Sequence, residues 1–175
     1  MSVLYTDRLI LRPFCATDAQ AMFDGWTQDA RVAKYCRWHP HTSLDMTEGL
    51  LAIYVDSTDP RYPYRHAITL KDGETLIGVI DVVEISPDGT TAEIGYLLAY
   101  PYWNKGYMTE ALEAMIAHLF ACGFRTVAAR HHIDNHGSGK VMEKCGMRYM
   151  GIEEAPGKFG SDEQVLVKCY EISQK

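Results

Sequence analysis

Apolar residues recur at the spacing of one helix face between residues 108 and 120. The stripe consists of Met108, Ala111, Leu112, Met115, Ile116, Leu119 and Phe120, as expected for an amphipathic helix packed on a core. Gly123 follows where a helix commonly ends. A strand-like apolar run over residues 91–98 comes first, and a polar turn at 104–106 separates the two. The pattern therefore predicts a strand, a tight turn and a helix N-terminus in this order.

The rest of the chain predicts further strands and helices on both sides of this segment. Strands are expected over residues 4–14, 125–132, 149–154 and 164–172, with two more from residue 67 joined at Asp72 and Gly73. Helices are expected over 17–26, 43–56 and 137–144, with a helical turn at 29–35. This order indicates a mixed α/β (α+β) fold rather than a doubly wound sheet. Composition does not change along the chain, so residues 1–175 are expected to form a single domain.

Charge and cysteine content exclude several classes of protein. The net charge of −6 argues against a nucleic-acid-binding surface, which is normally basic. The apolar runs are short and interrupted by charges, so we expect neither a signal peptide nor a membrane partner. The five cysteines are odd in number and contain no Cys-x-x-Cys pair, which is typical of a reduced, cytoplasmic protein.

The predicted helix start is a possible phosphate site. The first turn of a helix carries free N–H groups and the positive end of the helix dipole, so a phosphate there meets several donors. Gly106 is the position where a bare backbone can approach such a ligand closely. A glycine in a strand–turn–helix can equally be a turn residue without a ligand.

The sequence around this turn resembles that of a known protein family. Residues 92–112 read AEIGYLLAYPYWNKGYMTEAL, and residues 135–147 contain Asn135, Ser138 and the run VMEKCGM. Both segments resemble the GCN5-related N-acetyltransferases (GNAT), and within them the branch of the ribosomal-protein N-terminal acetyltransferases. Asn104 replaces a usual glycine, and Met108 a usual Gly or Ala. Because a long side chain at 108 would obstruct a pyrophosphate, we expect Met108 to point into the core.

The resemblance implies a fold, a cosubstrate and a binding segment. The fold is a central, mostly antiparallel sheet with a splayed parallel strand pair and flanking helices. Acetyl-CoA is the implied cosubstrate, and no metal is expected. The pyrophosphate would be held by Lys105, Gly106, Tyr107, Met108 and Thr109, and the pantetheine arm by Tyr96, Leu97, Leu98 and Asn135. The N–H of Leu98 would face the thioester oxygen.

Proton transfer has two candidate residues. Glu93 lies where the branch often carries a glutamate thought to act through water, but it can equally be an ordinary solvent-facing strand carboxylate. An α-amine, with a pKa near 8, depends less on a base than a lysine side chain, with a pKa near 10.4. Met142 stands where many relatives place a tyrosine acid, so Ser138 or water would protonate the thiolate. Ser138 can instead be a helix cap.

The acceptor site is expected at the loop of residues 36–42. Trp38, His39 and His41 are candidates for acceptor contacts by resemblance, or Trp38 simply packs and the histidines are solvated. A metal at His131, His132 and His136 is not favoured, because no further ligands complete a site. The expected activity is acetyl transfer from acetyl-CoA to a protein N-terminus or a small-molecule amine, in a monomer or homodimer. The alternative is a non-catalytic acyl-CoA-binding or sensing module.

Overall fold

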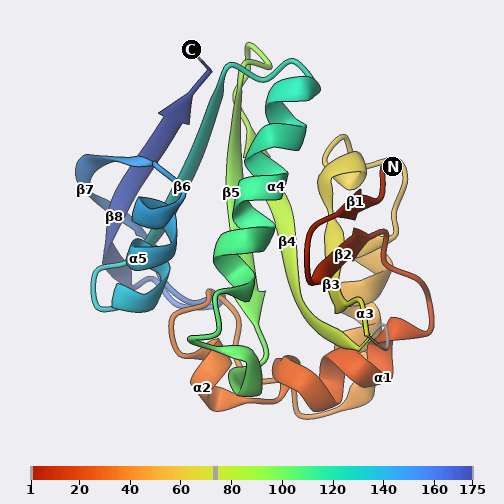
Figure 1. Cartoon of the computed structure of the whole chain (residues 1–175). Helices are drawn as coiled ribbons and strands as arrows, with labels where there is room; N and C mark the ends of the chain where they lie inside the picture. The colour runs from red at the N-terminus through yellow and green to blue at the C-terminus, as the bar shows by residue number, and fades with distance from the viewer. Residues whose placement is uncertain (1, 73–74, 175) are drawn as a thin grey trace.

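The computed structural model describes residues 2–72 and 75–174, and its centre is a sheet in the order β1-β2-β3-β4-β5-β6-β8-β7 (Figure 1). The strands are β1 Leu4–Tyr5, β2 Leu9–Arg12, β3 His66–Leu70, β4 Leu76–Ile85, β5 Thr91–Leu98, β6 Thr126–His132, β7 Arg148–Pro156 and β8 Gln164–Ser173. The α-helices are α1 Asp18–Met22, α2 Ala30–Ala33, α3 Leu44–Tyr54, α4 Tyr107–Ala121 and α5 His136–Lys144. A π-helical turn, Phe23–Thr27, extends α1. The mixed α/β prediction is confirmed.

One predicted strand is wrong. The expected strand over residues 4–14 is two short strands, β1 and β2, paired as an antiparallel hairpin. The polar residues between them form the turn, where the Thr6 N–H donates to the Leu9 carbonyl at 3.1 Å. The predicted hairpin between β3 and β4 is present, with the Leu70 N–H donating to the Thr75 carbonyl at 3.0 Å. Of the expected turn pair, Gly73 lies outside the described residues.

The two faces of the sheet carry different cores. On one face α4 packs over strand residues such as Ile68, Ile80 and Ile94. On the other face α1 and α3 pack over Ala67 and Val79. Figure 1 shows α4 and α5 side by side over the first face, with α1 low in the view. Because side chains alternate along a strand, neighbouring β5 residues serve opposite faces.

The parallel pair of the sheet separates at its centre. All other neighbours are antiparallel, but β5 and β6 run parallel and pair only from Thr91–Thr126 to Ile94–Ala129. Beyond Ile94 the two strands diverge, as Figure 1 shows below their labels. The expected splayed pair is thus present, and it leaves one edge of β5 open from Gly95 to Leu98.

Candidate active site

The turn before α4 presents a series of free donors. Gly106 has the left-handed angles φ 80° and ψ 0°, and Asn104 has φ 59°. The first backbone bond of the helix runs from the Glu110 N–H to the Gly106 carbonyl, at 3.2 Å. Among the described residues, none accepts a hydrogen bond from the N–H groups of residues 105–109. Such a series at a helix N-terminus is suited to an anion.

The side chains around the turn leave these donors accessible. Met108 is only 6% exposed and packs in the α4 core, as expected from the sequence. A Cβ on Gly106 would meet Arg8 Nη2 at 3.4 Å, which is ordinary contact. The requirement for glycine therefore comes first from its positive φ, which residues with a Cβ rarely adopt. The sequence suggested glycine for the close approach of a ligand, and the structure adds this backbone conformation as a reason.

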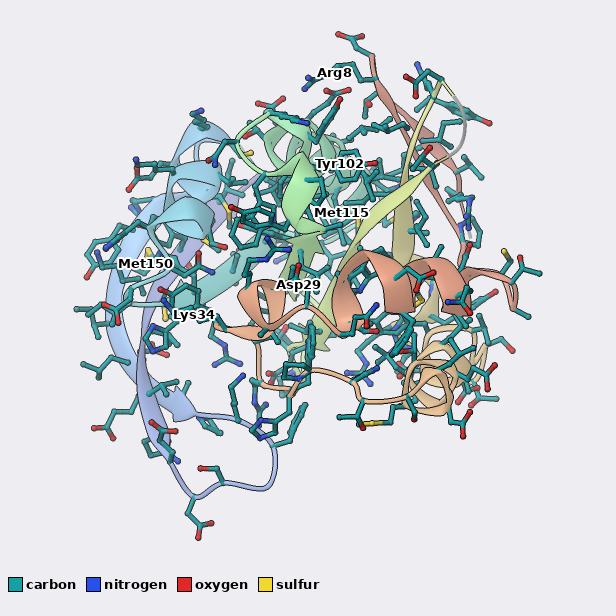
Figure 2. The ribbon with its side chains drawn as sticks, turned by 90° about the horizontal axis from the view of Figure 1, so that it is seen from below. Arg8, Asp29, Lys34, Tyr102, Met115 and Met150 are labelled. Carbon is teal, nitrogen blue, oxygen red and sulfur yellow. The ribbon has the colours of Figure 1, made fainter. Side chains whose placement is uncertain are left out.

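An ion pair from the N-terminal hairpin fixes the first turn of α4. Arg8 Nε donates to Glu110 Oε2 at 2.7 Å, and the Thr6 hydroxyl and the Arg8 N–H donate to Glu110 Oε1 at 2.6 and 2.7 Å. Arg8 Nη1 also donates to the Lys105 carbonyl at 3.0 Å. Figure 2 shows Arg8 on the same side of the molecule as Tyr102, which lies next to Tyr107. No local sequence pattern predicts this arrangement.

The open edge of β5 presents backbone groups from alternate residues. Leu98 pairs with Gly78 and Leu97 with Val79 across the β4–β5 ladder. The Ala99 N–H donates to the Ile77 carbonyl at 2.8 Å, so by alternation the Leu97 backbone also faces β4. The backbone groups of Tyr96 and Leu98 point the other way, into the gap beside β6. Of the expected pantetheine residues, Leu97 is therefore not placed for backbone pairing.

The start of α5 closes the other side of the gap. The Tyr96 hydroxyl donates to the Ser138 carbonyl at 3.1 Å, which joins α5 to β5. Asn135 is the N-cap residue of α5, and its Oδ1 accepts from the Ser138 N–H. Asn135 Nδ2 donates to Ser138 Oγ at 3.2 Å. Ser138 is therefore not the cap, and its hydroxyl hydrogen remains available for another acceptor. Met142 is buried in the core.

Glu93 is neither exposed nor free. It lies on the face opposite α4, and Arg130 Nε on β6 contacts its Oε1 at 2.8 Å. Burial raises the pKa of Glu93; the charge of Arg130 lowers it, and Glu84 raises it further. The reading of Glu93 as an ordinary solvent-facing carboxylate does not hold, because its side chain is only 21% exposed.

The loop of residues 36–42 is joined to the connection between β7 and β8. Lys158 Nζ donates to the carbonyls of Ala33, Cys36 and Trp38 at 2.8, 2.9 and 3.0 Å. Trp38 packs against the α1–α3 core, and His41 Nδ1 lies 2.8 Å from the Thr47 hydroxyl. Burial lowers the pKa of His41. Trp38 and His41 thus have structural partners.

His131 and His136 line one pocket, but His131 and His132 each stack on a tyrosine. His131 stacks on Tyr170 at 5.6 Å between ring centroids, and His132 stacks on Tyr35 at 5.2 Å. Within residues 2–72 and 75–174, no group of three His, Cys, Asp or Glu side chains is arranged to hold a metal ion. No helix in this part of the chain is both long and apolar enough to cross a membrane.

Comparisons with known proteins agree with this geometry. Residues 8–148 match the model of the acetyltransferase (GNAT) domain. An uncharacterised N-acetyltransferase of Bacillus licheniformis, p20, is 28% identical over 164 residues, covering 91% of this chain and 92% of that protein. A GNAT-family acetyltransferase from Bacillus anthracis superposes with a TM-score of 0.85 at 25% identity, covering 98% of both chains.

A third comparison concerns the branch that the sequence resembles. The ribosomal L7/L12 α-N-protein acetyltransferase RimL, solved in complex with coenzyme A, has a TM-score of 0.81 at 20% identity and covers 98% of both chains. At this identity the match shows the shared fold. The resemblance predicted from residues 92–112 and 135–147 is confirmed by the family match. The chain therefore belongs to the GNAT family and is an acetyltransferase.

Proposed function

We propose that this protein transfers an acetyl group from acetyl-CoA directly to an amine, either a protein N-terminal α-amine or a small-molecule amine. The observation that carries the proposal is the run of five N–H groups, residues 105–109, that have no acceptor within residues 2–72 and 75–174 and lie next to the open edge of β5. A pyrophosphate on the turn would let the pantetheine arm follow Tyr96 and Leu98 into the gap. RimL, which shares the fold, was solved with coenzyme A bound.

The chemistry follows from the groups around the gap. The Leu98 N–H would donate to the thioester oxygen as it becomes an oxyanion, the kind of stabilisation that contributes most when donors are fixed in advance. Glu93, acting through water, would accept a proton from the attacking nitrogen. Ser138 Oγ already accepts from Asn135, so its own hydrogen can be donated to the sulfur of the departing thiolate.

Among the possible acceptors, an α-amine depends least on the enzyme for removal of its proton. Its pKa of about 8 leaves a useful neutral fraction at pH 7, whereas a lysine near 10.4 is almost wholly charged. The name of RimL describes it as an α-N-protein acetyltransferase. We therefore place α-amines first among the acceptors.

The test is release of free thiol from acetyl-CoA in the presence of an amine panel, with mass spectrometry of the amine. The panel should contain short peptides with free N-termini, Nα-blocked lysine and small amines. The proposal predicts thiol and acetylated amine in equal amounts. Tight acetyl-CoA binding with thiol release no faster than hydrolysis for every amine would favour the binding module instead.

A further inference from the structure

Asp81 lies over the point where the parallel strands separate. It pairs with Gly95 in the β4–β5 ladder, one residue beyond the last β5–β6 pair at Ile94 and Ala129. A Cβ on Gly95 would lie 3.3 Å from Asp81 Oδ1. The carboxylate is thus held above the β5 backbone, on the same face as Glu93 and opposite α4. Asp81 belongs to no motif that the sequence alone reveals.

The carboxylate of Asp81 has no partner among the described residues, which donate neither a hydrogen bond nor an ion pair to it. The charged and titratable groups that face it are Tyr54 from α3 and Asp59, Arg61 and Arg65 from the segment before β3. Both arginines bind Asp59 instead, each at 2.7 Å. Burial raises the pKa of Asp81 to about 6, and the two arginines act in the opposite direction. The carboxyl oxygens of Asp81 are not among the buried side-chain atoms that lack a hydrogen-bond partner, so solvent, or the cationic group of a ligand that displaces it, can reach them.

The reaction supplies such a cationic group. An amine reaches the enzyme mainly as an ammonium ion, and its nitrogen loses two protons before it becomes an amide. Asp81 over β5 and Glu93 paired with Arg130 both lie on the face opposite α4, at the strand opening. Glu93 has a cationic partner at 2.8 Å, whereas none of the described cations forms an ion pair with Asp81, so the two carboxylates are suited to different steps.

We propose that Asp81 binds the ammonium group of the acceptor and takes its first proton, so that the site selects amines that arrive as cations. This inference rests on the proposed function. One N–H bond of the ammonium breaks and its proton moves to Asp81. The freed electron pair forms the N–C bond to the thioester carbon, and the carbonyl π electrons move to the oxygen. Collapse re-forms the carbonyl and breaks the C–S bond.

The remaining proton transfers account for every proton that the reactants lose or gain. The nitrogen gives its second proton to Glu93 through water, and the thiolate takes one proton from Ser138, which is resupplied by solvent. Both carboxyl groups return their protons to solvent. The sum is one ammonium and one thioester converted to one amide, one thiol and one released proton. No other reactant is required.

The test compares Asp81→Asn with Glu93→Gln, using Glu113→Gln as the matched control. Glu113 is an exposed carboxylate on α4, which packs on the opposite face of the sheet from Asp81. Steady-state kinetics with Nα-blocked lysine amide should show that Asp81→Asn raises the amine KM by about 10-fold or more, the scale of a charged hydrogen bond. Glu93→Gln should lower kcat with KM nearly unchanged, and Glu113→Gln should change neither. An Asp81→Asn enzyme with the wild-type amine KM and kcat would overturn the inference while leaving the proposed function intact.

A second measurement uses the wild-type protein and therefore does not depend on a stable variant. In the wild-type protein saturated with CoA, carbon-13 NMR follows the titration of the Asp81 carboxyl with and without the blocked lysine amide. A bound ammonium should shift the titration to lower pH, whereas blocked norleucine amide, which lacks the ammonium, should not. A shift without acetyl transfer to any amine of the panel would support the ammonium site and refute the proposed function. An unchanged titration, with turnover present, would refute the role of Asp81.

Discussion

Arg8 should control CoA affinity through the charge of Glu110. Glu110 lies in the first turn of α4, close to the donors that would hold a pyrophosphate. Burial alone would raise its pKa, but hydrogen bonds from Thr6 and Arg8 keep the pKa of Glu110 below its ordinary value, so it is ionised. Arg8→Gln would leave this carboxylate without its cationic partner beside the ligand.

The size of the effect follows from two contributions. A unit charge about 8 Å from two phosphate charges, at an effective dielectric of about 40, costs roughly 2 kcal/mol. Loss of the bond from Arg8 Nη1 to the Lys105 carbonyl adds about 1 kcal/mol. Together these predict that Arg8→Gln weakens CoA binding by roughly 100-fold at low ionic strength, and by less in high salt because charges are screened.

A double-mutant cycle separates charge from simple loss of structure. With Glu110→Gln added, the repulsion disappears and only the lost hydrogen bond remains, so CoA affinity measured by calorimetry should recover to within about 10-fold of wild type. If Glu110 were only a structural partner, the second substitution would leave affinity as low as in Arg8→Gln or lower. That result, or wild-type affinity in Arg8→Gln itself, would refute the reasoning.

Three further substitutions test the turn and the proton path. Gly106→Val should lose CoA affinity, because valine opposes the positive φ and crowds the turn; unchanged calorimetric affinity would remove the turn from the site. Glu93→Gln should lower kcat and remove an acidic limb displaced to higher pH by the raised pKa of Glu93; equal losses across pH would make Glu93 structural. Ser138→Ala should reduce kcat and kcat/KM together by about 5-fold, the worth of about one hydrogen bond, with acetyl-CoA affinity kept; a lower melting temperature at unchanged kcat would leave water as the acid.

The local features of the site could be predicted from the sequence. The helical stripe from Met108, the turn at Gly106 and the buried position of Met108 follow from short-range patterns, and the structure contains all three. The strand over residues 4–14 was mispredicted because apolar residues on both sides of Thr6 hide a turn that is fixed by hydrogen bonds to Leu9.

The residues that the sequence analysis missed depend on contacts between distant segments. Arg8 and Glu110 meet across 102 positions. Asp81 acquires its place from the β4–β5 register, and Lys158 from three carbonyls more than a hundred residues earlier. None of these has a local pattern, so only the assembled sheet brings them to the site. The β4–β5 register likewise determines that the backbone groups of Tyr96 and Leu98, and not those of Leu97, face the gap beside β6.

Amide chemical shifts on addition of CoA test the central claim most directly. In a proton–nitrogen correlation spectrum, the N–H signals of residues 105–109 should move downfield as they donate to the pyrophosphate, and those of Tyr96 and Leu98 should shift with the pantetheine arm. The Leu97 N–H, which faces β4, serves as the internal control and should move least. Unchanged signals at 105–109, or a Leu97 shift equal to those of its two neighbours, would contradict the account.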